Sequence, residues 1–418
     1  MRQLLTHGIA IFVIAFLAFE LSINGVWSTD HATSFVQLDY ALWNSHSVAL
    51  GHPSSVPPLT VDDFHFRGQN YSALAPGTAF LALPFMGLAF TLAGGYTLFG
   101  PALVMSETFV SLTGAISAYL VYKMAGLFFR RSTSVFLGFV FAFSTICWPF
   151  ATFFFQSDVS AMLVLLAAYF ALKVGRSEGQ SLAPSLLCGL AAGAAFTVDY
   201  VNAVLLPILL VFLVVMKRGL KSSTAWTAAA YVLGALPGLI MIGAYDFAIF
   251  GNPFVTTEQT YLRQSSLLGS FSTPLPIGLA LDLVSLSKGL FVFTPFLVLG
   301  ALGYTDGLRA DGGKGHRPEM IMLLAIFLGI LLPYSAWYDP SGGVGFGPRF
   351  LVAAIPFLLL PAGYAIEQAK GVFTWVTYGA YLLGVAINGM AALASPIPPV
   401  TPFNVSPFYR YVLPNFEA

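Results

Sequence analysis

Long apolar stretches recur along the whole chain and are separated by short polar segments. A helix needs about 20 apolar residues to cross a bilayer, and eleven stretches reach this length or nearly so. They are residues 7–27, 101–122, 134–153, 157–173, 183–198, 200–216, 223–249, 285–303, 319–337, 349–366 and 371–393. The pattern predicts an all-α polytopic membrane protein with about eleven transmembrane helices.

A further apolar segment, residues 73–99, contains Pro76, Pro84 and four glycines. These residues interrupt a spanning helix, so a re-entrant or interfacial helix competes with a membrane span here. Basic residues decide between the two, because cytoplasmic loops carry an excess of Lys and Arg. If residues 73–99 do not cross, thirteen of the eighteen basic residues fall on one face and five on the other. A crossing would separate Arg2 from the later basic loops, so we predict that this segment does not cross.

This topology places the N-terminus in the cytoplasm of a multi-pass cell-membrane protein. The first apolar run is too long for a signal peptide and reads as a retained helix. Residues 1–393 form one transmembrane domain, in which residues 28–99 are a first outer loop with interfacial or re-entrant helices. Residues 394–418 form a C-terminal tail on the outer face.

Composition agrees with this class, because 57% of the residues are hydrophobic and only 9% are charged. Ordinary soluble domains carry about 25% charged residues. The formal net charge is zero, which gives no attraction for nucleic acid. Cys147 and Cys188 lie in apolar runs and are interpreted as small core residues.

Three segments on the outer side carry the candidate chemistry: residues 28–72, 251–284 and 338–348. Acidic residues gather on this face, whereas basic residues gather on the opposite one. They are Asp30, Asp39, Asp62, Asp63, Asp158, Asp199, Glu258, Asp282 and Asp339. Avoidance of acids in cytoplasmic loops is a simpler explanation for several of them.

The first outer loop contains the most candidate residues. A helix from Ser34 to Leu50 would form a broad apolar arc, as in a helix that lies in the membrane interface with its apolar side toward lipid or protein. Asp39 projects from this arc, where a carboxylate is costly unless it has a partner or turns to water. Asp30 lies at the water–membrane boundary, where a carboxylate can act as general base on a hydroxyl.

Asp62, Asp63 and His65 form a second acidic cluster or a metal ligand set. Adjacent acids point apart and only one neighbouring histidine is present, so a divalent metal stays an open alternative that the pattern does not indicate, and no cofactor is firmly implied. We take Asp63 as a second catalytic candidate beside Asp30. Candidates for substrate binding are Asp39, Asp62, His65, Tyr71, Tyr338 and Asp339.

The segment YDPSGGVGFGPRF, residues 338–350, places four glycines immediately before Arg349 at a helix start. Exposed amides and an arginine there make an anion site, and a phosphate at the outer surface implies a lipid phosphate. A tight turn with an interfacial arginine is the alternative. Lys288, which opens another apolar stretch, is a candidate second cation. No Gly-Lys-Ser/Thr phosphate loop is present, so nucleotide binding is not indicated.

In these residues the chain resembles the GT-C membrane glycosyltransferases, the group that includes protein O-mannosyltransferases and lipid A aminoarabinose transferases. The likeness covers nearly the whole chain. It rests on the Asp30 loop, GQNYSALAPGTAFLALPF (68–85), FGNPF with a following Tyr261, and WYDPSGGVGFGPRFLVAAIPFLLL (337–360). Two departures concern O-mannosyltransferases: His31 follows Asp30 where they have Glu, and Ala75-Pro76-Gly77 replaces a Lys-Pro-Pro-like segment.

The resemblance implies a polyprenyl-phosphate-linked sugar donor, an acid that activates the acceptor, and cations that hold the leaving phosphate. Asp30 would be the catalytic carboxylate and Arg349 a phosphate partner, with Lys288 beside it. We therefore expect a hexosyl- or pentosyltransferase that acts on a lipid, glycan or protein acceptor at the outer face. A lipid-linked sugar flippase or transporter, or a non-catalytic GT-C relative, are the alternatives.

Overall fold

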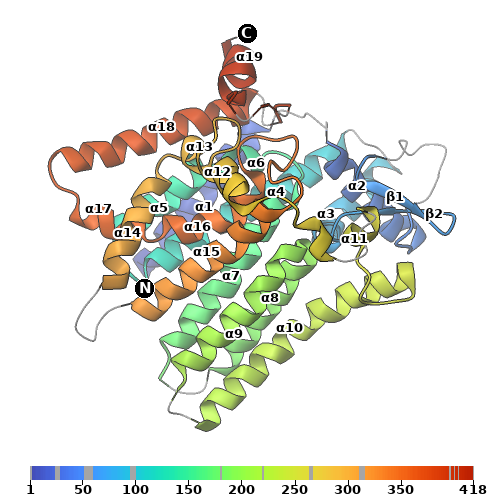
Figure 1. Cartoon of the computed structure of the whole chain (residues 1–418), viewed down its shortest axis with the longest axis horizontal. Coiled ribbons are helices and arrows are strands. Elements are labelled where there is room, and N and C mark those ends of the chain that lie inside the picture. Colours follow the sequence, from blue (N-terminus) through green and yellow to red (C-terminus); the bar gives the residue numbers. More distant parts are fainter. Residues whose placement is uncertain are drawn as a thin grey trace.

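The computed structural model describes residues 2–23, 29–50, 60–94, 100–178, 181–218, 221–262, 267–309, 316–394, 397–399, 401–402 and 404–417. Helices dominate this part of the chain (Figure 1), as the apolar pattern predicts. The N-terminal elements are α1 (Arg2–Ser22), α2 (Asp30–Tyr40), the π-helical turn η1 (Ala41–Ser45), β1 (Asp63–Phe66), β2 (Gln69–Ser72), α3 (Gly77–Ala93) and α4 (Pro101–Ala125).

The middle of the chain contains α5 (Arg131–Phe143), α6 (Cys147–Phe150), α7 (Gln156–Gly175), α8 (Leu182–Val198), the 3₁₀ turn η2 (Tyr200–Val204), α9 (Leu205–Met216) and α10 (Lys221–Phe250). Helices α7 to α10 lie side by side in the lower part of Figure 1.

The last third of the chain alternates short helices and turns with three longer helices. Its elements are α11 (Thr257–Tyr261), η3 (Leu267–Ser270), α12 (Leu275–Val284), α13 (Leu290–Phe293), α14 (Leu297–Arg309), α15 (Arg317–Ala336), η4 (Arg349–Ala354), α16 (Ile355–Leu359), α17 (Ala362–Gln368), α18 (Val372–Ala394), η5 (Phe408–Val412) and α19 (Leu413–Glu417).

Each of the eleven apolar stretches contains helical residues, but their lengths differ. In the described part of the chain, five helices are long and apolar enough to cross a membrane, and a bent pair would make a sixth. The five are Pro101–Ala125, Gln156–Gly175, Ser223–Phe250, Arg317–Ala336 and Val372–Ala394. Six further apolar helices are shorter, α3 among them, so the number eleven is not confirmed although the polytopic all-α class is.

The predicted helix over residues 34–50 is wrong in its bounds, whereas its surroundings match one of the two predicted alternatives, protein and not lipid. The helix begins at Asp30 because the Thr29 hydroxyl accepts a hydrogen bond from the Ala32 amide and caps it. The helical segment ends after Ser45, where His46 adopts a positive φ of 49°. Phe35, Val36 and Leu38 are buried within the protein, so this apolar face packs on other helices and not on lipid.

A β-hairpin that the sequence analysis did not anticipate lies against α2. β1 and β2 pair antiparallel from Asp63 opposite Ser72 to Phe66 opposite Gln69. The two connecting residues, Arg67 and Gly68, both have positive φ, as a tight hairpin turn requires. The Ser34 hydroxyl donates to the Asp63 carboxylate at 2.7 Å and lies 2.7 Å from the Ser72 hydroxyl. These bonds fix the hairpin, and the Asp62 turn before it, to α2.

α8 and α10 approach each other closely through small residues. A Cβ atom on Gly189 would lie 1.9 Å from the Tyr231 carbonyl oxygen, and one on Gly234 would lie 2.1 Å from that of Leu186. Gly193 and Gly238 continue the same contact one turn further along each helix. Glycines four residues apart on both partners permit this close backbone packing, which is a common contact between helices in membranes. α8 leads directly into Asp199, so its position sets one side of the site described next.

Candidate active site

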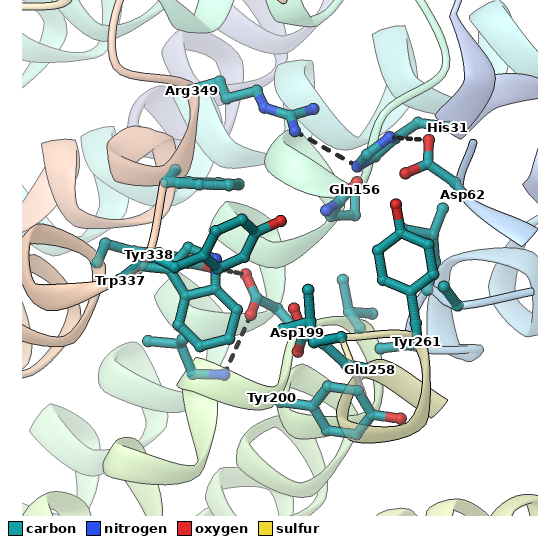
Figure 2. Close-up of a pocket in the computed structure, with 18 residues that line it drawn as sticks. His31, Asp62, Gln156, Asp199, Tyr200, Glu258, Tyr261, Trp337, Tyr338 and Arg349 are labelled. Atoms are coloured by element: carbon teal, nitrogen blue, oxygen red, sulfur yellow. Dashed lines mark hydrogen bonds and ion pairs between the residues drawn. The ribbon is translucent and has the colours of Figure 1, made fainter. Parts of the chain in front are cut away.

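A cavity of about 120 Å³ lies where α2, the hairpin, α7, η2, α11 and η4 meet (Figure 2). Its walls therefore come from segments that are far apart in the sequence. Its lining residues are His31, Asp62, Ala73, Leu74, Ala75, Gln156, Val198, Asp199, Tyr200, Val201, Glu258, Tyr261, Leu262, Tyr334, Trp337, Tyr338, Arg349 and Phe350.

One end of the cavity holds a histidine bonded to a carboxylate. The distance from His31 Nδ1 to Asp62 Oδ2 is 2.5 Å, and the two side chains keep 16% and 14% of their surface exposed. The His31 ring also packs on Phe155, with 5.1 Å between ring centroids. Burial and the Arg349 charge lower the pKa of His31, while the bond to Asp62 opposes this shift. His31 is therefore neutral near pH 7.

Arg349 enters the same end of the cavity from the first residue of η4. Its guanidinium Nη2 lies 3.4 Å from His31 Nε2, and the group stacks over the Phe155 and Phe350 rings at 4.9 Å each. The side chain is only 7% exposed, and its Nε–H has no hydrogen-bond partner among the described residues. Within the described chain no carboxylate lies within 4 Å of it. A buried guanidinium without a counter-ion is costly, so the site is suited to an anion.

The glycine segment before Arg349 forms a turn, and Lys288 is hydrogen-bonded to its backbone. Gly342, Gly343, Gly345 and Gly347 all have positive φ, so side chains would be strained there. The Lys288 ammonium donates to the Gly343 and Gly345 carbonyl oxygens at 2.9 and 2.8 Å. Lys288 is only 2% exposed and does not line the cavity. Its contacts stabilise the turn that places Arg349.

The opposite end of the cavity is acidic. Asp199 follows α8 and caps η2, accepting a bond from the Val201 amide at 3.1 Å and another from the Tyr334 hydroxyl. Glu258 lies nearby in α11, and burial together with the Asp199 charge raises its pKa to about 8. Glu258 is therefore largely protonated at pH 7 and can donate a hydrogen bond, whereas Asp199 accepts.

Aromatic side chains form the walls between the two ends. Tyr261 lies on one side of the cavity and Trp337 and Tyr338 on the other, with Tyr200 near the acidic end (Figure 2). Gln156, from the first turn of α7, points toward the centre. Aromatic faces flanked by carboxyl and amide groups can bind a polar ring that also presents C–H bonds, as a sugar does.

Three of the predicted site residues line the cavity: Arg349, Asp62 and Tyr338. Asp30 is exposed at the first position of α2, beside His31, and its charge acts on both His31 and Tyr261. It does not line the cavity, although its neighbour His31 does.

The other predicted residues lie away from the cavity. Asp63 is buried in the hairpin, where it accepts bonds from Ser34 and from the Thr60 amide and hydroxyl. His65 bonds to Asn70 across the hairpin, and Tyr71 is buried beside them. Asp339 accepts bonds from the Ser341 amide and hydroxyl within the glycine turn.

Asp39 does not turn to water, which was one of the two interpretations of its position. It is completely buried, and neither carboxylate oxygen has a hydrogen-bond partner among the described residues. Burial raises its pKa well above the usual range, which favours the protonated form. The neutral carboxyl group needs no counter-ion in the apolar surroundings of α2.

Sequence reasoning missed His31, Gln156, Asp199, Glu258 and Trp337 as site residues. Two of them carried a signal, because Asp199 and Glu258 belong to the group of acids on the outer face. His31 was noticed only as a departure from a family pattern. His31 and Ala75, which both differ from the O-mannosyltransferase pattern, line the cavity. In the described part of the chain, no group of three or more His, Cys, Asp or Glu side chains could hold a metal ion.

Residues 84–241 match the family model described as dolichyl-phosphate-mannose-protein mannosyltransferase. Comparison with curated proteins gives no match. ArnT from Cupriavidus metallidurans, bound to undecaprenyl phosphate, is 17% identical with a TM-score of 0.57 over 91% of this chain and 62% of that one. The fold is that of a GT-C membrane glycosyltransferase.

A second GT-C structure agrees with the first. The archaeal oligosaccharyltransferase AglB from Archaeoglobus fulgidus, in complex with an inhibitory peptide and a dolichol-phosphate, is 12% identical. Its TM-score is 0.54, with 91% of this chain and 56% of that one covered. The chain thus spans less than two thirds of the length of these GT-C relatives. The likeness confirms the GT-C fold and a multi-pass membrane protein.

Proposed function

We propose that this protein is a glycosyltransferase that moves one sugar from a polyprenyl-phosphate-linked donor to a hydroxyl group of a lipid, glycan or protein at the outer face of the cell membrane. The observation that carries the proposal is Arg349. Its buried guanidinium faces a cavity without a carboxylate partner in the described chain, opposite two carboxyl groups and between aromatic walls.

A phosphodiester fits this end of the cavity better than a carboxylate or a nucleotide. A guanidinium binds two phosphate oxygens at once, and each charge-assisted bond is stronger in a desolvated site. The cavity lies in a protein made mostly of apolar helices, so a donor with a polyprenyl chain reaches it from the bilayer. The ArnT and AglB structures, which contain undecaprenyl phosphate and dolichol-phosphate, support this class of ligand.

The reaction that fits is a single displacement at the anomeric carbon. The acceptor oxygen bonds to this carbon as the bond to the phosphate oxygen breaks, and the bonding electrons remain on the departing polyprenyl phosphate. Arg349 stabilises the charge that develops there. Asp30, exposed beside His31, takes the proton of the acceptor hydroxyl, as the resemblance implies. The sugar would lie among the aromatic walls, with its hydroxyls toward Asp199 and Glu258.

The direct test is turnover by the purified full-length chain in liposomes. We expect a radiolabelled polyprenyl-phosphate sugar to release polyprenyl phosphate in the presence of a suitable lipid, glycan or peptide acceptor. Hexose and pentose donors are tested separately, because the proposal does not specify which sugar is transferred. Movement of labelled donor between leaflets without turnover would contradict the proposal and identify a flippase.

Arg349→Gln tests the residue that carries the proposal. We expect it to weaken donor binding and turnover together, by about 2 to 4 kcal/mol if the phosphate is desolvated. Arg410→Gln is the matched control, because Arg410 is exposed on the turn η5 and far from the cavity lining. Equal activity of both variants would remove the main support for the proposal.

A further inference from the structure

Three side chains form a hydrogen-bonded series at the basic end of the cavity: Asp62, His31 and Arg349 (Figure 2). A guanidinium nitrogen can only donate, so His31 Nε2 accepts from Arg349 across 3.4 Å. The hydrogen on the imidazole must then lie on Nδ1, which donates it to Asp62 Oδ2 at 2.5 Å. Asp62 therefore fixes both the orientation and the tautomer of a neutral His31.

We propose that His31 is the second phosphate-binding group of this cavity, and that it takes up a proton when a phosphate group binds beside Arg349. This inference rests on the proposed function, because it takes a polyprenyl phosphodiester as the ligand. It assigns to His31 the role that the sequence suggested for Lys288, whose ammonium is bonded to the glycine turn instead.

Geometry favours two donors over one at this position. His31 Nε2 and Arg349 Nη2 are neighbours in the cavity lining, at a spacing that phosphate oxygens can bridge. The hydrogen bond between these two nitrogens is long and therefore weak, so an entering phosphate oxygen displaces only a weak interaction. The same oxygen would face the unprotonated lone pair of Nε2, which repels it. A proton on Nε2 converts this repulsion into a second charge-assisted bond.

The charges around the ring make the proton uptake favourable. The groups that act on His31 are Arg349 from η4, Asp62 from the turn before β1, and Asp30 from its own helix. Burial and Arg349 lower the pKa of His31, while Asp62 and Asp30 raise it. Tyr261 faces the cavity from α11 and is uncharged near pH 7, because burial raises its pKa further. A bound phosphate offsets the Arg349 charge, so the imidazolium becomes stable between Asp62 and the phosphate.

The coupling between proton uptake by His31 and phosphate binding fixes the sign of the pH dependence of the affinity. In the empty site the pKa of His31 is low, and in the occupied site it is higher, so binding takes one proton from the solvent between these two values. Across that window the affinity falls as pH rises, by up to about tenfold per pH unit. Below both pKa values His31 is already protonated in the empty site, so the affinity no longer changes with pH. Above both values His31 stays neutral and adds little to the affinity.

The probe should have a charge that does not change with pH. The monomethyl ester of farnesyl phosphate, a diester with one negative charge, meets this need, whereas a phosphate monoester titrates in the same range. Binding to the full-length chain in detergent is measured by calorimetry from pH 5.5 to 8.5, in two buffers of different ionisation enthalpy. We expect weaker binding as pH rises and uptake of up to about one proton.

Variants separate the role of His31 from general damage. His31→Gln should bind the diester roughly tenfold more weakly at low pH and equal the parent chain at high pH, with no proton uptake. Asp62→Asn should shift the pH dependence toward lower pH. His316→Gln, a partly exposed histidine beside Glu319 and outside the cavity lining, is the matched control and should leave both quantities unchanged.

Each outcome decides something. If His31→Gln keeps the affinity and the pH dependence of the parent chain, the inference about His31 is wrong while the proposed function stands. If the parent chain does not bind the diester at all, the proposed function fails first. Inorganic phosphate is the comparison arm: His31-dependent binding of it at similar affinity would support the role of His31 but contradict selection of a lipid headgroup.

Discussion

Acidic residues near the cavity differ in what their surroundings allow them to do. Asp30 is exposed at the first position of α2, so its carboxylate is accessible to an entering hydroxyl group. Asp62 already accepts the His31 bond, and Asp63 is used inside the hairpin. Asp30 is therefore available for catalysis, whereas Asp62 and Asp63 support neighbouring groups.

Asp30→Asn should therefore reduce kcat by roughly 100-fold or more and leave donor binding nearly intact. Asp62→Asn should instead raise KM for the donor, because His31 loses its partner. The measurement is steady-state turnover over a range of donor concentrations. Abolished transfer in Asp62→Asn or Asp63→Asn, with near-normal Asp30→Asn, would move the catalytic base to the second acidic cluster.

A substitution at Lys288 tests whether this residue stabilises the glycine turn or contacts the donor phosphate directly. Lys288→Met keeps a similar length but removes the donors to Gly343 and Gly345, so we expect a loss of about 2 kcal/mol in stability together with weaker donor binding. Thermal unfolding in detergent and binding of the phosphodiester are measured on the same sample. Weaker binding at unchanged stability would show instead that Lys288 contacts the phosphate itself.

The sequence could predict those site residues whose local pattern is distinctive. Arg349 follows four glycines, and the acids of the outer loops stand out in an apolar chain; Arg349, Asp62 and Tyr338 of the predicted residues line the candidate cavity. His31 stands out only as a departure from the family pattern, because its role comes from bonds to Asp62 and Arg349 that the fold creates. Gln156 carries no local signal. Asp62 and Asp63 are adjacent in the sequence, and their different bonding partners in the fold separate them.

At the level of helices and strands, apolar length was a better guide than apolar periodicity. The stretches that became α4, α7, α10, α15 and α18 were recognised by length alone. The bounds of α2 depended on the Thr29 cap and the turn at His46, and the hairpin on Arg67 and Gly68. Such short signals are hard to see beside a strong apolar pattern.

The glycines between α8 and α10 give a prediction about packing. Gly234→Ala places a Cβ against the Leu186 carbonyl oxygen at 2.1 Å, so the helices must separate and we expect a loss of about 1 to 3 kcal/mol. Gly379→Ala in α18 is the control, because nothing lies within 4 Å of its added Cβ. Helix propensity alone would make both changes neutral or stabilising, so equal thermal stability of the two variants would contradict the close packing.

For the whole molecule, the distribution of basic residues predicted the sidedness, and the cavity gathers the outer-side segments as expected. Residues from the first outer loop, from α11 and from η4 share its walls. That these segments meet follows from the packing of the helices, which the sequence does not reveal. Which face of the membrane they occupy remains a prediction of the charge pattern.

Cysteine labelling tests this orientation in a background with Cys147→Ala and Cys188→Ala. Ser272→Cys should react with an impermeant maleimide added outside intact cells, because it is exposed in the outer segment 251–284. Glu178→Cys, exposed in an inner loop, should react only after permeabilisation. Gly313→Cys, which lies outside the described residues, should behave like Glu178→Cys, and its labelling from outside would mean that the helix count is wrong.

The cavity is built from segments spread along most of the chain, from His31 to Phe350. During synthesis, the ribosome must therefore release more than three quarters of the protein before the phosphate end of the site can exist. A nascent chain that has inserted α1 to α11 holds Asp62, Asp199 and Glu258 but no Arg349. Under the proposed function, a chain truncated before η4 should therefore insert into the membrane but not bind the polyprenyl-phosphate donor.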